Sequence, residues 1–286
     1  MPSTYAHYRM GQEVRRALAG NPKLAVESYP ELYLIGLHGP DILFYYHALT
    51  TDPVNQIGYG MHDRPGREFL EKAAEIIRQY GGEKAYLSYV YGFICHFALD
   101  VTCHGYIDEK IEASGVTHAE IEVEFDRMLM VRDGLDPIRH KLTGHIVPSE
   151  RNAKVIQAFF GGVTGEQVKK ALEGMITYNN LLVAPSRLKR EMIYLLLRAS
   201  GNYKEMHGLL VNYRPNPDCE DSDDKLSRLY ERAKKMALRL IGEYGAFILG
   251  HGALDPIYDY TFGSRPPEEI PEKKTEEAAA FAMGKS

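Results

Sequence analysis

The sequence has few cysteines and no long apolar run. Its three cysteines, Cys95, Cys103 and Cys219, form an odd and sparse set that suits a reducing compartment better than a disulfide framework. No segment approaches the roughly 18 uninterrupted apolar residues of a membrane-spanning helix. Residues 1–4 lack the basic and apolar regions of a signal peptide. The sequence therefore predicts a cytoplasmic protein without a transmembrane segment.

The chain also lacks an excess of positive charge. It carries 34 Lys and Arg against 39 Asp and Glu, a formal net charge of −5. Because nucleic-acid binding rests largely on Lys and Arg side chains that neutralise phosphates, no stable nucleic-acid partner is expected. A metal enzyme that acts on a phosphate ester remains compatible with this charge, since bound cations bring their own positive charge.

Strand-like alternation of polar and apolar residues is nearly absent, and helical patterns dominate. With 286 residues, 44% of them hydrophobic, the chain is long enough to bury a large core. We predict an all-α, single multi-helix domain over residues 1–265, and a charged, Ala-rich tail over 266–286 that is expected to be disordered. Helices are predicted at 10–19, 65–80, 83–104, 117–131, 149–159, 165–177, 186–199 and 223–248, with a stop at the Gly-Asn-Pro of 20–22 and a surface loop at 212–222.

The strongest chemical signal is His96-x-x-x-Asp100, followed by His104. Residues four apart on a helix share one face, so an imidazole and a carboxylate at this spacing can reach one zinc ion. The surrounding residues 89–99 are almost all apolar, which places this stripe in the interior, where an ionised Asp needs a partner. For this motif alone, a core histidine hydrogen-bonded to Asp100 is the more common explanation.

His118 and Glu122 repeat the four-residue spacing at the head of a second predicted helix. Thr117 and Glu120 form a capping-box pattern there. Taken alone, this segment is more often a solvated acidic first turn that complements the helix dipole.

Asp41 follows a turn built from Gly39 and Pro40, and an apolar segment comes after it. An Asp in this position usually only caps a helix. His7, His47 and His62 are single histidines, of which His62 directly precedes the predicted helix at 65–80. Each signal is weak alone, but their order along one helical chain is better explained by a shared metal cluster than by coincidence.

In this order the residues resemble the zinc-dependent phospholipase C family, whose helical fold also includes the S1/P1 nucleases. The family pattern is an early His, an Asp after a Pro-containing turn, a His heading a helix, HxxxD in an apolar helix, a further His, and HxxxE. The resemblance runs from about His7 to Glu122. It implies two or three zinc ions held by His7, Asp41, His62, His96, Asp100, His104, His118 and Glu122.

The resemblance also implies how these ligands divide. Secreted members use their processed N-terminal amine as a further ligand, whereas this chain starts at Met1, so one site is expected to be weak or completed by another group. The first zinc would lie between Asp41, His62, His96 and Asp100, the second between Asp100 and His7, and the third between His104, His118 and Glu122.

The implied activity is phospholipase C-like cleavage of a phosphodiester by a zinc-activated water, with Asp41 as the candidate general base. The expected substrate is a small phosphodiester or a phospholipid headgroup. Ile42 stands beside Asp41, where the phospholipases place part of their headgroup pocket, so phosphatidylcholine is not assigned as the substrate. The alternatives are a non-catalytic zinc-binding helical protein, an S1/P1-like nuclease and an ordinary bundle with core histidines. Four further histidines lack a carboxylate at useful spacing and are interpreted as structural or surface residues: His140, His145, His207 and His251.

Overall fold

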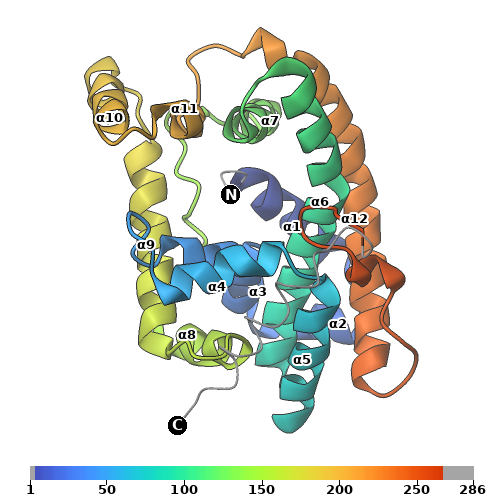
Figure 1. Ribbon diagram of the computed structural model, residues 1–286. Coiled ribbons are helices and arrows are strands. Elements are labelled where there is room, and N and C mark those ends of the chain that lie inside the picture. The colour runs from blue at the N-terminus through green and yellow to red at the C-terminus, as the bar shows by residue number, and fades with distance from the viewer. Residues whose placement is uncertain (1–3, 267–286) are drawn as a thin grey trace.

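The centre of the structure is α6 (Lys84–Ser114), a helix of 31 residues that is buried on almost every side between residues 85 and 101. This computed structural model describes residues 4–266. α12 (Glu220–Ile248) runs along one side of α6, and α3 (Pro30–Gly36) also packs against α6 (Figure 1). A helix that is apolar all round is stable only with such neighbours on several faces.

Two glycines let α3 and α6 touch through their backbones. A Cβ atom at Gly36 would overlap the carbonyl oxygen of Tyr89, and a Cβ atom at Gly92 would overlap the carbonyl oxygen of Tyr33. Backbone atoms cannot move aside as a flexible side chain does, so a larger residue at either position would push the helices apart. The turn after α3 therefore lies against the middle of α6, where η1 (Gly39–Tyr45) contacts it.

Two further helices, α1 (Thr4–Ala17) and α7 (His118–Arg132), pack against α6, α12 and each other. The carboxylate of Asp126 on α7 accepts hydrogen bonds from the backbone N–H groups of Tyr5 and Ala6, at 2.9 and 2.8 Å. These N–H groups belong to the first turn of α1, which has no intrahelical partners for them. One buried carboxylate thus fastens the start of α1 to the middle of α7.

The prediction of an all-α fold is confirmed. Among the described residues there are helices and no strand, apart from an isolated bridge between Pro65 and Thr261. The predicted helix at 65–80 corresponds to α5 (Gly66–Gln79), and α7 opens with the predicted capping box. Both α6 and α9 (Gly165–Leu182) continue several residues beyond their predicted ends.

Predictions near the N-terminus are partly wrong. The first helix begins at Thr4 instead of residue 10 and ends at Ala17, and the Gly-Asn-Pro of 20–22, predicted as a stop, opens α2 (Gly20–Ser28). Pro22 is tolerated because N–H groups in the first turn of a helix need no intrahelical acceptor. For the same reason prolines open α3 and α4 (Pro53–His62), neither of which was predicted. His62 ends α4 and does not head a helix.

The other helices complete the outer part of the fold. The predicted loop at 212–222 includes a short 3-10 turn and the first residues of α12, which begins at Glu220. The remaining elements are α8 (Glu150–Ile156), η2 (Gln157–Phe159), α10 (Arg187–Ala199), α11 (Tyr203–Met206), η3 (His207–Leu209), η4 (Pro217–Cys219) and η5 (Pro256–Asp259).

Within residues 4–266, no helix combines the length and the apolar character needed to span a bilayer. Cys95, Cys103 and Cys219 are all buried and free. The tail predicted at 266–286 lies, except for its first residue, outside the described residues. The domain boundary at residue 265 stays a prediction.

Candidate metal centre

All eight predicted zinc ligands meet in the interior, although they come from five separate elements. Six of them are buried, and the side chains of His62 and His118 are 18% and 31% exposed. Each side chain belongs to at least one of three groups whose potential ligand atoms lie within 4.8 Å of one another. The contributing elements are α1 with His7, η1 with Asp41, α4 with His62, α6 with His96, Asp100 and His104, and α7 with His118 and Glu122.

The first group joins Asp41, His62 and His96. The Oδ1 atom of Asp41 lies 3.0 Å from Nε2 of His62 and 3.8 Å from Nε2 of His96. The other nitrogen of His62, Nδ1, lies 3.0 Å from the carbonyl oxygen of Gly58, one turn earlier in α4. Because that carbonyl can only accept a hydrogen bond, it fixes the tautomer of His62 and directs the Nε2 lone pair at Asp41.

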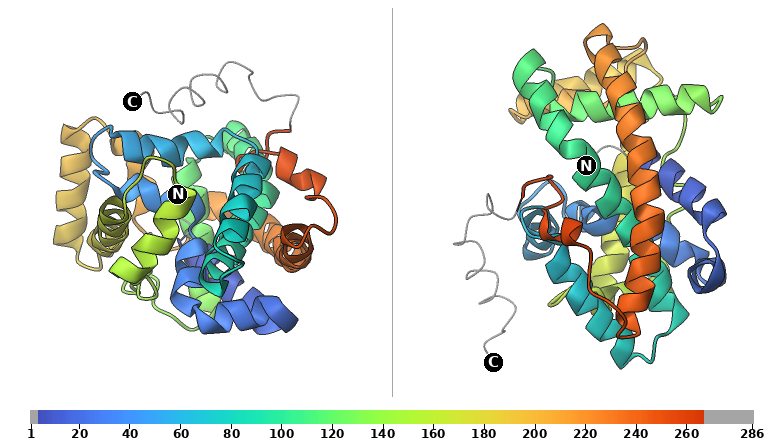
Figure 2. Two further views of the ribbon diagram at one scale, coloured as in Figure 1. Left: turned by 90° about the horizontal axis from the view of Figure 1, so that it is seen from below. Right: turned by 90° about the vertical axis from the view of Figure 1, so that its right-hand side faces the viewer.

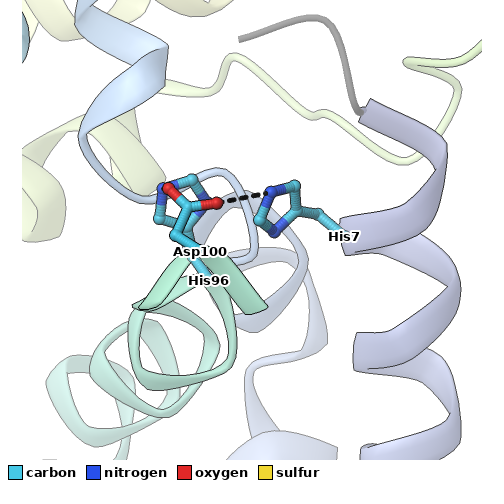
Figure 3. Close-up of side chains that lie close together, drawn as sticks. All are labelled: His7, His96 and Asp100. Atoms are coloured by element: carbon cyan, nitrogen blue, oxygen red, sulfur yellow. Dashed lines mark ion pairs between the residues drawn. The ribbon is translucent and has the colours of Figure 1, made fainter. Parts of the chain in front are cut away.

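The second group joins His7 of α1 to His96 and Asp100 of α6 (Figure 3). The two oxygens of Asp100 point in different directions: Oδ1 lies 3.2 Å from Nε2 of His7, and Oδ2 lies 3.2 Å from Nε2 of His96. The rings of the two histidines stack with their centroids 4.4 Å apart. His96 belongs to both the first and the second group. Asp100 therefore has the geometry of a carboxylate that bridges two sites, as the family resemblance implies.

The third group comprises His104, His118 and Glu122. The Oε1 atom of Glu122 lies 3.1 Å from Nε2 of His118 and 3.5 Å from Nε2 of His104. Nδ1 of His104 lies 2.8 Å from the carbonyl oxygen of Phe262, which can only accept its proton. This hydrogen bond turns Nε2 of His104 towards Glu122, so that its lone pair would face a bound cation once Nε2 is deprotonated.

A cavity of about 20 Å³ lies between the second and third groups. Its polar walls are His7, Asp100, His104 and Glu122. A cavity of this size holds about one water molecule or ion. The two groups consequently border one small shared space, whose remaining walls are mainly apolar and include Leu99, Ile107 and Phe125.

Charge pairing shapes the proton affinities of these side chains. Burial lowers the pKa of His104, but the carboxylates of Asp100 and Glu122 outweigh burial and raise it to about 10. Burial raises the pKa of Glu122, but His118 and His104 outweigh burial and lower it to about 2. The pKa of His96 is also raised, because Asp100 and Asp41 overcome the effect of its complete burial. Without a metal ion, these carboxylates draw protons onto the imidazoles.

The donor set and its lack of hydrogen bonds fit zinc. Histidine nitrogens and carboxylate oxygens are the usual zinc ligands, together with cysteine. Buried polar groups in proteins almost always have a hydrogen-bond partner. Among the described residues, seven buried atoms on these ligands form no well-oriented hydrogen bond, although several lie close to a partner of opposite charge: Nδ1 of His7, Nε2 of His62, both ring nitrogens of His96, Oδ2 of Asp100, Nε2 of His118 and Oε2 of Glu122. A bound cation would satisfy several of them at once.

Sequence reasoning missed the groups that orient these ligands. The carbonyls of Gly58 and Phe262 carry no signal in the sequence, because any residue supplies a carbonyl. Gly39 has a positive φ of 47°, and a Cβ atom there would overlap the ring of His96. The turn residue Gly39 thus permits the close approach of η1 to α6.

Other histidines lie outside the three groups, as predicted for most of them. His38 and His145 contact each other through their Nε2 atoms at 2.7 Å, and His145 stacks on Tyr8. His47 is exposed and pairs with Asp52. His140, His207 and His251 are half-buried or exposed.

Comparison with known proteins identifies a family. The family model described as zinc dependent phospholipase C matches residues 6–173, which is 168 of the 286 residues. The matched region contains all eight side chains of the three groups. Searches of curated proteins and of solved structures found no match.

Proposed function

We propose that this chain, which belongs to the zinc-dependent phospholipase C family, is a zinc-dependent hydrolase that cleaves a phosphodiester. The observation that carries the proposal is the meeting of eight buried or half-buried His, Asp and Glu side chains in three adjoining groups. Residues far apart in sequence, from His7 to Glu122, provide them. An ordinary core does not need such a cluster, because burying each of these groups is costly without a partner.

The eight side chains would hold the ions and fix their spacing. When bound, zinc supplies positive charge for the phosphate oxygens and lowers the pKa of a water molecule towards about 7. Asp100 would tie the first two sites together through its two oxygens, and Gly58 and Phe262 would keep His62 and His104 in the required tautomer. The chain thus presents a preorganised set of lone pairs to the ions.

Asp41 is the proposed general base. It lies on η1, and its carboxylate is close to His62 and His96 within the first group. The residue is 5% exposed. A proton leaving the attacking water would pass to this carboxylate. The proposed substrate class is a small phosphodiester or a phospholipid headgroup.

Metal content and turnover together test this function. We expect two to three zinc ions per chain in protein purified without a metal-binding tag, measured by plasma mass spectrometry, together with hydrolysis of bis-p-nitrophenyl phosphate or short-chain phosphatidylcholine. His96→Ala and His118→Ala should each lose zinc and activity, because each removes a nitrogen ligand. His251→Ala, which changes an exposed histidine outside the groups, is the matched control and should retain both.

Zinc without turnover would favour the alternative, a non-catalytic zinc-binding protein. A well-folded sample that contains no stoichiometric metal would refute the proposal, since the histidines would then be core residues only.

Asp41→Asn separates catalysis from metal binding. The amide keeps one oxygen that can contact a cation but cannot accept a proton at neutral pH. We expect turnover of bis-p-nitrophenyl phosphate to fall by about 100-fold or more, in line with the loss of a general base, while most of the zinc is retained. Unchanged turnover in this variant would remove Asp41 from the mechanism.

A further inference from the structure

The outward side of α10 carries a stripe of exposed apolar side chains. Leu188, Met192, Leu195 and Leu196 are 73%, 58%, 65% and 68% exposed. At 3.6 residues per turn, these four positions fall within about 100° of arc on the helix. They account for four of the 13 large exposed hydrophobic residues in the described part of the chain. The remaining exposed hydrophobics are spread over several other elements, so α10 is where they concentrate.

The opposite side of α10 is firmly attached to the protein. Ile193 packs into a small apolar cluster with Ala184 and Leu210, which is separate from the main core. Arg190 is buried and donates hydrogen bonds to the carbonyl oxygens of Ala184 and Val211. The outward stripe is therefore not a core face that the fold failed to cover. It belongs to a helix whose inner face already has its partners.

Positively charged side chains lie at both ends of this stripe. Arg187 opens the helix and Arg198 lies in its last turn, and both are exposed. Within residues 4–266, neither guanidinium forms an ion pair with a carboxylate, and Arg198 instead lies over the ring of Tyr203 at 4.3 Å. The chain as a whole has a net charge of −5. The helix itself carries four basic residues and one acidic residue, Glu191. Of the basic residues only Arg190 is buried, so the surface of α10 is basic on an acidic protein.

We infer that α10 docks the protein onto a lipid surface that contains anionic phospholipid. An amphipathic helix with leucines on one face and Lys or Arg beside them is the type that lies in the plane of a membrane interface. Figures 1 and 2 show α10 at the periphery of the molecule. The four apolar side chains would enter the headgroup region, and the two arginines would contact lipid phosphates. This inference rests on the proposed function, because a lipid surface is where a phospholipid substrate is found.

Vesicle co-sedimentation tests the inference directly, with vesicles of phosphatidylcholine that contain or lack phosphatidylglycerol. The wild-type protein should bind, and more tightly when phosphatidylglycerol is present. Replacing Leu195→Gln together with Leu196→Gln should weaken binding about tenfold or more, since each buried leucine favours the bilayer strongly. The control replaces Leu49→Gln together with Leu249→Gln, two leucines that are 78% and 71% exposed elsewhere, and should bind as wild type. Gln retains helix propensity, and circular dichroism confirms that each variant is folded.

The electrostatic part is tested with Arg187→Gln combined with Arg198→Gln. This variant should lose most of the preference for phosphatidylglycerol while still binding weakly to phosphatidylcholine alone. Added salt should weaken the wild type more than this variant. Equal preference for anionic vesicles in both proteins would overturn the assignment of the arginines.

The possible outcomes separate this inference from the proposed function. If the wild-type protein does not bind vesicles but hydrolyses bis-p-nitrophenyl phosphate, the docking surface is wrong and the hydrolase proposal stands. If vesicles are bound through α10 but no turnover is found, the surface stands and the hydrolase proposal falls. If sedimentation analysis shows a dimer that Leu195→Gln with Leu196→Gln dissociates, and vesicles are not bound, the stripe is an interface between two copies and the lipid inference is overturned.

Discussion

At the scale of single residues, the turn before Asp41 depends on a glycine. Gly39 has φ of 47°, in the left-handed region, and a Cβ atom there would overlap the ring of His96. Both the backbone angle and the missing side chain are needed for η1 to bring Asp41 beside His96. The glycine therefore serves the metal site as well as the turn.

Gly39→Ala should disturb the site more than it disturbs the turn. The strained φ costs about 1 kcal/mol, and the overlap must in addition displace His96, which belongs to two of the three groups. We expect a loss of bound zinc, measured by plasma mass spectrometry, together with a lower melting temperature. The control is Gly20→Ala, because Gly20 has φ of 61° but a Cβ atom there would meet no neighbouring atom within 4 Å. Equal zinc content in the two variants would contradict this explanation.

At the scale of helices, Asp126 connects the parts of the site that α1 and α7 supply. It lies four residues after Glu122 on α7, hence on the same face, and its carboxylate bonds the N–H groups of Tyr5 and Ala6, directly before His7. At 2% exposure it is shielded from water. The position of His7 relative to the third group therefore depends on this carboxylate.

We expect Asp126→Asn to weaken the zinc beside His7 by about tenfold to 100-fold, the usual cost of losing an outer group that orients a ligand. The amide keeps one acceptor oxygen and loses the second, as well as the charge. Competition with a chelator would measure the affinity of the protein for its most weakly bound zinc ion. Asp133→Asn is the control, since Asp133 also joins α7 to α1 but through the side chains of Tyr5 and Arg9. A similar loss of zinc affinity in both variants would mean that general loosening of α1 is the cause.

The central helices could be predicted from sequence, whereas the connections between them could not. The apolar run of α6 is a local pattern, and so is the four-residue spacing within each ligand pair. This spacing identifies His96 and Asp100 as neighbours on one helix, and His118 and Glu122 as neighbours on the next. α2 was missed because Pro22 was interpreted only as part of a helix stop. α3 and α4, which were also missed, likewise open with a proline, and a proline in a first turn cannot be told from a helix breaker when its position is unknown.

The same limit applies to the site. The two ligand pairs were predicted from their spacing and the complete set through the family resemblance, and the structure brings all eight together. The carbonyl oxygen of Phe262 is a hydrogen-bond partner of His104, although the two residues are 158 positions apart in the sequence. Such a contact has no local pattern, since it depends on how the last described segment returns to α6. For the same reason, the hydrogen bonds between Asp126 and the start of α1 could not be predicted from the sequence and are seen only in the structure.

At the scale of the whole molecule, zinc binding and folding should be linked through pH. Nearby carboxylates raise the pKa of His104 to about 10 in the metal-free protein, against a usual value of about 6.5. A raised pKa means that the protonated imidazole stabilises the folded state. This contribution is complete below pH 6.5 and is lost as the pH rises to about 10. Glu122, whose pKa is lowered to about 2, stays ionised across this range and adds no change.

Zinc replaces the proton, because a ligand nitrogen must be deprotonated to bind a metal. The metal-free protein should therefore lose stability between about pH 6.5 and 10, while the zinc-loaded protein should not. We expect the difference in melting temperature between zinc-loaded and EDTA-treated samples to grow steadily with pH in this range. Calorimetry in buffers of different ionisation enthalpy should show that protons are released on zinc binding at pH 7.5. A melting-temperature difference that is constant with pH, with no proton release, would mean that His104 is already neutral before the metal arrives and that its carboxylate neighbours do not hold a proton on it.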